Sequence, residues 1–184
     1  MDTKCLHAIR CGCEADRVRR HNLLRDFLFS ECKRAMMAPL KEPKNLIRNS
    51  DQRPADFGIH DYRPGIFMAY DVAVTDPSQV AFVSISSSVA GHAAESYANR
   101  KFSKYADALD RDVTLNLTPL IVESFGRWSL SSSLFFRSLA SWLAARNPST
   151  SLPVIKSRLF QKASIILQRA NAKMILSRIS VKSE

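Results

Sequence analysis

A single aspartate interrupts an apolar run near the middle of the chain. The segment Ile66–Val74 is apolar or aromatic apart from Asp71, and its length and composition predict a buried strand. An ionised carboxylate in a buried strand is costly unless another group compensates its charge. A bound cation is one such compensation. Asp71 therefore predicts a strand that carries a cation site.

A second acidic residue precedes this strand in a segment that forms a hairpin with it. The stretch Arg53–Ile59 contains Asp56 and is strand-like, and the sequence Tyr62–Gly65 between the two stretches is a turn signal. The two segments are therefore predicted to pair as an antiparallel hairpin.

Two registers of this hairpin are open. A turn centred between Arg63 and Pro64 places Asp56 directly opposite Asp71, whereas a type II turn centred on Pro64 and Gly65 makes Asp56 its diagonal neighbour. Both registers put the two carboxylates on one face. Such strand neighbours lie roughly 4.5 to 8 Å apart, which is close enough to share one divalent metal. The alternative is two unconnected aspartates, one at a strand end and one in a turn.

Length and composition predict one α/β domain with appended helices. A chain of 184 residues with 46% hydrophobic content can bury one core. No apolar run is long enough to span a bilayer, and the charged N-terminus encloses no signal-peptide core. We therefore expect a soluble, intracellular protein without a membrane partner. All four cysteines lie within the first 32 residues, so we expect no disulfide framework.

Basic charge is concentrated in the C-terminal third. Residues 127–184 hold ten of the 27 basic side chains but one of the 17 acidic ones, a balance that favours a polyanion, nucleic acid before membrane. Four cations of a predicted helix over 154–179 lie within about 60° on a helical wheel of 100° per residue. These candidate nucleic-acid contacts, together with Arg53 beside the hairpin, are Arg158, Lys162, Arg169 and Lys173.

The periodicities predict three regions along the chain. Residues 1–15 form a lead that contains cysteine and histidine. Residues 16–126 form the core: a helix over 16–37, a short edge strand at 41–43, the hairpin, a serine-rich turn at 84–88, a helix over 92–111 and a strand over 113–123. Residues 127–184 form two basic helices, over 129–145 and 154–179, that pack on the core.

This order of elements resembles the restriction-endonuclease-like fold of the PD-(D/E)xK nuclease class. More narrowly, several motifs are similar to those of the restriction-like endonuclease domain of site-specific non-LTR retrotransposon proteins. The motifs are Arg20-His21-Asn22, Pro54-Ala55-Asp56, Asp71-Val72-Ala73-Val74, Lys101-Phe102-Ser103-Lys104-Tyr105, the segment Pro119–Gly126 and the segment Leu167–Ala172. Together they cover nearly the whole chain.

The resemblance implies metal-dependent cleavage, usually nicking, of DNA. It implies that Asp56 and Asp71 hold Mg²⁺ or Mn²⁺, which polarises the scissile phosphate and activates a water. The general motif would place a lysine at Ala73, and alanine cannot supply that chemistry. In the retrotransposon branch the lysine comes from the following helix, so Lys101 or Lys104 would take this role, and the sequence does not separate the two.

Further residues have both a functional and a structural interpretation. His7 and Cys11 have the spacing of a zinc knuckle, and the family has a cysteine pair just upstream, where this chain has Met1; a remnant zinc site is the functional alternative to ordinary thiols. We expect His21 to be structural rather than catalytic. Glu42 and Glu123 could add carboxylates to the site or lie at an edge or on the surface.

The sequence thus predicts a nuclear, metal-dependent DNA endonuclease domain. It would be a fragment or a decayed copy of a retrotransposon protein, with DNA as partner and the RNA of the parent element as a further one. The alternative is a catalytically inactive nucleic-acid-binding remnant with the same fold. The alanine at position 73 favours this alternative, and the acidic pair argues against it.

Overall fold

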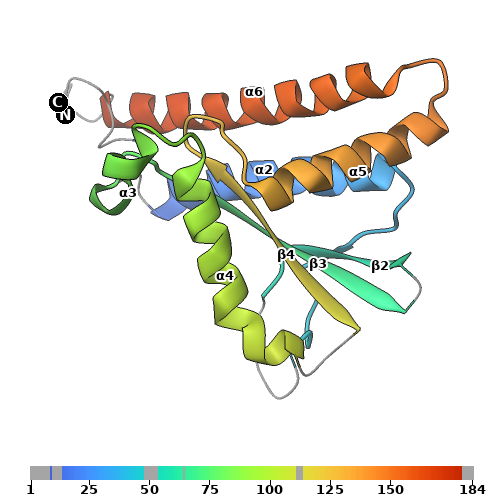
Figure 1. The fold of residues 1–184 in the computed structure, drawn as a ribbon. Helices are drawn as coiled ribbons and strands as arrows, with labels where there is room; N and C mark the ends of the chain where they lie inside the picture. The colour runs from blue at the N-terminus through green and yellow to red at the C-terminus, as the bar shows by residue number, and fades with distance from the viewer. Residues whose placement is uncertain (1–8, 10–13, 48–53, 64, 111–113, 180–184) are drawn as a thin grey trace.

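A four-stranded mixed sheet lies at the centre of the protein. The computed structural model describes residues 9, 14–47, 54–63, 65–110 and 114–179. The strands are β1 (Leu40–Lys41), β2 (Phe57–Arg63), β3 (Ile66–Thr75) and β4 (Leu115–Glu123), in that spatial order. β1 and β3 each pair antiparallel with β2, and β4 pairs parallel with β3 (Figure 1). The predicted α/β class is confirmed, as is the short, exposed edge strand.

The predicted hairpin is present, and it contains both of the predicted registers. Near the turn Arg63 pairs with Ile66, which is the register of a turn centred on residues 64 and 65. Beyond an irregularity, Ile59 pairs with Met68 and Phe57 with Tyr70, which is the other register. Because β2 uses four residues where β3 uses two, the strand contains a bulge. Asp56 lies one residue before the last of these pairs, and its backbone N–H donates to the carbonyl oxygen of Tyr70.

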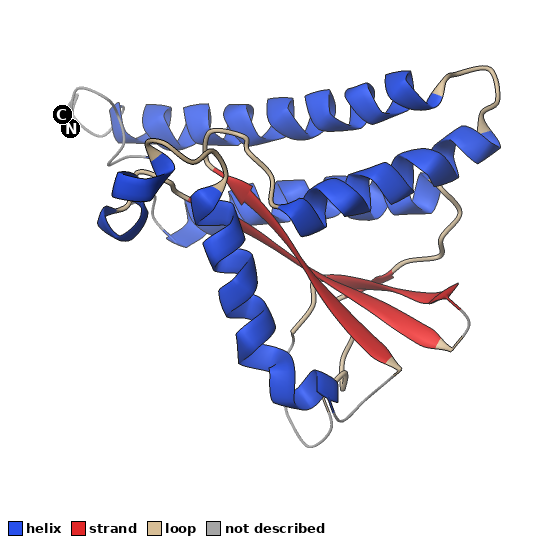
Figure 2. Cartoon of the chain, in the orientation of Figure 1, coloured by secondary structure: helices blue, strands red, loops and turns tan. Residues whose placement is uncertain are grey.

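Three long helices gather along one side of the sheet, and a fourth lies apart from them (Figure 2). The three are α2 (Glu14–Arg34), α5 (Leu130–Arg146) and α6 (Leu152–Ile179), and they share one hydrophobic core with β2, β3 and β4. The fourth is α4 (His92–Asp110), which connects β3 to β4 and packs its alanines against Ile121 on the opposite face. These helices start and end within a few residues of their predicted positions.

Alternation along β3 decides which side chains face which helices. Tyr70 and Val72 enter the core formed with α2, α5 and α6, whereas Ala69 and Ala73 pack on the α4 side. Asp71 lies between Tyr70 and Val72 in sequence, so its side chain points to the α4 face. The strand therefore delivers one carboxylate to the helix that carries both candidate lysines.

One predicted turn is wrong in part. The serine-rich segment 84–88 was expected to be a turn, but its first residues belong to a short helix, α3 (Val80–Ser86). The hydroxyls of Ser87 and Ser88 donate to the carbonyl oxygens of Ser84 and Ile85, at 2.7 and 3.1 Å. These bonds satisfy carbonyls of the last helical turn, so here serine stabilises a helix end instead of excluding a helix.

Candidate active site

Asp71 forms an ion pair with a lysine of the crossing helix. Its side chain is buried, and Nζ of Lys101 lies 2.6 Å from Oδ2. The lysine lies in the middle of α4, the helix that covers the face of the sheet to which Asp71 points. The cation compensates a carboxylate whose burial alone would be costly.

The two charges of this pair influence each other's protonation. Burial raises the pKa of Asp71, Lys101 opposes that rise, and the negative charge of Asp56 adds to it. Burial lowers the pKa of Lys101, but the charge and contact of Asp71 outweigh burial, so its pKa is raised above the ordinary value. Lys101 is therefore protonated and positively charged. A further cation near Asp71 would stabilise the ionised form of its carboxyl group.

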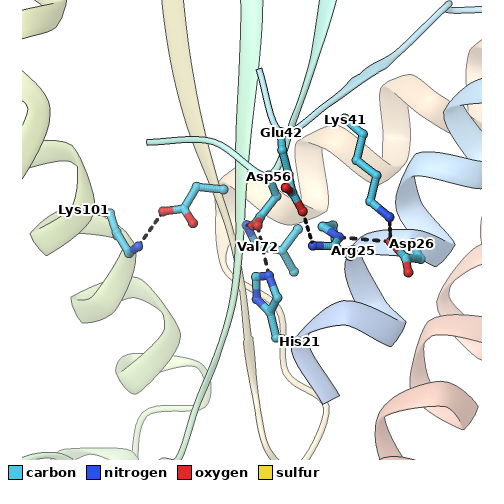
Figure 3. Close-up of polar contacts among 9 residues, drawn as sticks. His21, Arg25, Asp26, Lys41, Glu42, Asp56, Val72 and Lys101 are labelled. Atoms are coloured by element: carbon cyan, nitrogen blue, oxygen red, sulfur yellow. Dashed lines mark hydrogen bonds and ion pairs between the residues drawn. The ribbon is translucent and has the colours of Figure 1, made fainter. Parts of the chain in front are cut away.

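Asp56 lies directly before β2 and is fixed by polar contacts of its backbone and its carboxylate. Its backbone N–H donates to the carbonyl oxygen of Tyr70 at 2.8 Å. Oδ2 accepts from the backbone N–H of Val72 at 2.7 Å, and Oδ1 lies 2.9 Å from Nε2 of His21. The two carboxylates therefore contact partners on different helices, and the prediction that both lie on one face of the hairpin is not confirmed. Figure 3 shows Lys101 on one side of the strands and His21 on the other.

His21 is part of this arrangement, although its sequence context predicted a structural role. It lies one turn before the buried Leu24 on α2. Because residues three apart share one face of a helix, the ring of His21 faces the sheet as Leu24 does. The hydrogen bond to Asp56 raises the pKa of His21, burial opposes this effect, and the charge of Asp56 adds to it. The motif Arg20-His21-Asn22 was the only signal in the sequence that could have indicated this contact.

The structure separates the two candidate lysines. Lys101 reaches Asp71, whereas Lys104 is exposed and its Nζ lies 4.9 Å from the ring centroid of Tyr105. On α4, Lys104 is rotated by about 300° from Lys101 and lies roughly 4.5 Å further along the helix axis. The two side chains therefore start from different points. Of the two, Lys101 is the residue positioned for chemistry at Asp71.

The side chains of the two further glutamates bind partners other than the aspartates, although the backbone N–H of Glu42 donates to the carbonyl oxygen of Asp56 at 2.8 Å. Glu42 accepts a hydrogen bond from Nη1 of Arg25 at 2.8 Å. Oε1 of the buried Glu123 accepts from the backbone N–H groups of Ala93 and Ala94 at 3.1 and 3.3 Å, which stabilises the N-terminus of α4. The structural interpretation therefore accounts for both.

The donor set of the site suits a cation that binds few protein ligands. Among the described residues, no group of three or more histidine, cysteine, aspartate or glutamate side chains could hold a metal ion. Mg²⁺ commonly binds to one or two carboxylates and completes its shell with water and substrate phosphate. Asp56 and Asp71 supply two carboxylates, which contact His21 and Lys101 respectively. The other predicted metal ligands, His7 and Cys11, and the predicted DNA contact Arg53 lie outside the described residues.

No protein-family model matches the sequence, and no curated protein matches it significantly. In the described ranges, no helix has the length and apolar character needed to cross a membrane.

Proposed function

We propose that this chain is a metal-dependent DNA endonuclease domain of the PD-(D/E)xK type, derived from a non-LTR retrotransposon protein. One observation carries the proposal: a lysine from the crossing helix lies 2.6 Å from the buried Asp71, and Asp56 directly precedes the strand that pairs with the Asp71 strand. Two acidic groups and a lysine form a set suited to phosphodiester hydrolysis. The helix, hairpin, crossing helix and parallel strand support the same assignment.

Each residue of the site has a distinct role in this proposal. Asp56 and Asp71 would hold Mg²⁺ or Mn²⁺, which supplies a Lewis acid and lowers the pKa of a bound water. Lys101 carries a permanent cation that can stabilise the charge that develops on the phosphate. His21 fixes the carboxylate of Asp56, together with the N–H of Val72. Lys101 therefore replaces the lysine that the general motif would have at Ala73.

A plasmid-nicking assay tests the proposal. Purified protein is incubated with supercoiled DNA and Mg²⁺ or Mn²⁺, with Asp56→Ala and Asp71→Ala as the site variants. We expect both variants to lose more than about 100-fold in nicking rate, because a removed metal ligand costs at least as much as a removed supporting contact. Nicking that survives both substitutions would place the chemistry elsewhere.

The noncatalytic alternative also has a specific observation in its favour. Asp71 is compensated by Lys101, and Asp56 by His21 and a backbone N–H, so each acidic group already has a partner. A protein that binds DNA without cleaving it could keep this arrangement. Binding of wild-type protein to duplex DNA, with no nicking in either metal at any enzyme concentration, would favour this alternative.

A further inference from the structure

The four candidate DNA contacts of α6 belong to two separate groups. α2 and α6 pack antiparallel, so Arg158 and Lys162 lie near the end of α2, whereas Arg169 and Lys173 lie near its beginning. The helical wheel placed all four on one stripe, but each pair meets different residues of α2. The midpoints of the two pairs are separated by about 16 Å along the helix axis, at 1.5 Å per residue.

The group near the end of α2 is partly neutralised within the protein. Arg34, Arg146, Arg158 and Lys162 line a hollow of about 230 Å³ together with Glu31. Glu31 is 4% exposed and forms ion pairs with Arg34 and, at 3.4 Å, with Lys162. A buried carboxylate among these cations reduces their attraction for an added anion.

The group near the beginning of α2 is different, because its cations are not paired. Arg19, Arg169 and Lys173 line a hollow of about 260 Å³, and all three side chains are exposed. Within the described part of the chain, none of the three forms a hydrogen bond or an ion pair. Asp16 is the acidic residue of the hollow, and it accepts a hydrogen bond from Ser177 at 3.3 Å.

This second hollow adjoins the candidate active site. The buried Arg20 lines it and also lines a neighbouring hollow of about 280 Å³, whose other residues include Arg17, His21 and Ala73. Nη1 of Arg20 donates to Oδ1 of Asn171 on α6 at 2.8 Å, which fixes the wall between the two hollows. Exposed cations thus continue from Arg17, which lines the same hollow as His21, to Arg169 and Lys173 of α6.

We propose that Arg19, Arg169 and Lys173 bind backbone phosphates of the DNA strand. These phosphates flank the phosphate at the candidate active site, and Arg17 contacts the strand between the active site and the other three cations. This inference rests on the proposed function, which it extends by giving the path of the substrate. A row of exposed cations over two adjoining hollows suits a chain of phosphates better than a single small anion. Binding at such contacts is independent of sequence and weakens with salt.

Two double substitutions of equal charge test this path. Arg169→Gln with Lys173→Gln removes two cations from the proposed path, and Arg158→Gln with Lys162→Gln removes two from the other end of the same helix. Affinity for a fluorescein-labelled duplex is measured by anisotropy without divalent metal, from about 50 to 200 mM salt. Thermal unfolding of each variant checks that the fold is retained, which the exposure of all four side chains leads us to expect.

The path proposal predicts an unequal result. The Arg169/Lys173 variant should lower the log–log salt slope by about 1 for each lost phosphate contact, whereas the Arg158/Lys162 variant should keep a slope close to wild type. Substituting Arg19→Gln and Arg17→Gln should each lower the slope further. Equal losses in both double variants, a loss confined to the Arg158/Lys162 variant, or no loss in either would overturn the path.

The binding readout distinguishes failure of the path from failure of the proposed function. If wild-type protein binds DNA through Arg169 and Lys173 but does not nick plasmid, the path stands and the nuclease assignment fails. If wild-type protein nicks plasmid while both double variants bind like wild type, the nuclease assignment stands and the path fails. Wild-type protein that does not bind the duplex at low salt would overturn the path as well.

Discussion

Nε2 of His21 lies 2.9 Å from Oδ1 of Asp56, which joins the first long helix to the first residue of the hairpin. Oδ2 of the same carboxylate accepts the N–H of Val72 at 2.7 Å. β2 pairs with β3 only as far as Tyr70. The carboxylate of Asp56 therefore provides a partner for the N–H of Val72, which lies beyond the last pair of the ladder. His21 thereby links α2 to the position where the two central strands separate.

The first prediction is that this link makes stability depend on pH. The hydrogen bond to Asp56 raises the pKa of His21, so the folded state holds a proton more tightly than the unfolded chain. The stabilisation is fully present below about pH 6.5, the ordinary histidine value, and is lost as pH rises through the raised pKa. Urea unfolding of wild type and His21→Gln across this range should give a difference that shrinks as pH increases.

A matched variant checks that the effect belongs to this pair. Asp56→Asn keeps the shape of the side chain but removes its charge, so His21→Gln should then cost less than it does in wild type. A coupling energy of about 1 kcal/mol at low pH is expected for groups in direct contact. A difference that does not change with pH would contradict the link.

The second prediction distinguishes the two lysines of α4. Lys101→Ala should slow nicking by about 10²- to 10³-fold, the cost of a lost donor at a developing charge, while DNA affinity stays nearly unchanged. Lys104→Ala is the matched control, because Lys104 lies over the Tyr105 ring and away from Asp71. Rates are measured at saturating DNA. Similar small losses in both variants would remove Lys101 from the mechanism.

The third prediction concerns the acid side of the pH–rate profile. Burial raises the pKa of Asp71, so metal binding through its ionised form should fail at a higher pH than for an ordinary aspartate. Removing the nearby cation in Lys101→Met should move this limit to still higher pH, because Lys101 lowers the pKa of Asp71. Residual nicking in Mn²⁺, or Mn²⁺ affinity followed by calorimetry, reports the shift. A shift to lower pH would contradict this electrostatic account.

The fourth prediction is that the C-terminal helix is part of the core rather than an addition to it. Leu167 is fully buried and belongs to the cluster shared by α2, the sheet and α5. Leu167→Ala should destabilise the protein by about 2 to 5 kcal/mol in chemical unfolding. Ile165→Ala, at a position 52% exposed on the same helix, should change stability by less than about 0.5 kcal/mol. Equal effects would argue against a shared core.

Local patterns predicted most of the elements and the hairpin. The turn residues limited the hairpin to two registers, and both occur because a bulge lies between Ile59 and Arg63. The apolar seam of the last helix was also predictable, since its periodicity has no competing interpretation. Both features depend on residues close together in sequence, where steric rules are strict.

Contacts between distant elements were not predictable in the same way. The hydrogen bond from His21 to Asp56 depends on how α2 lies across the end of β2, which no spacing in the sequence fixes. The helical wheel likewise placed Arg158 and Arg169 on one face, but the pairing with α2 decides that a buried Glu31 lies near Arg158 and unpaired Arg19 near Arg169. Tertiary packing determines which cations remain available.

The bulge in β2 also affects how freely the hairpin can vary. The tip follows one register and the end at Asp56 follows another, so the two ends of the hairpin are decoupled. A change of length at the tip can be absorbed at the bulge, where the ladder is already interrupted, without shifting the pairs of Ile59 with Met68 and of Phe57 with Tyr70. The tip can therefore gain or lose residues over evolutionary time while the strand pairing next to Asp56 is retained.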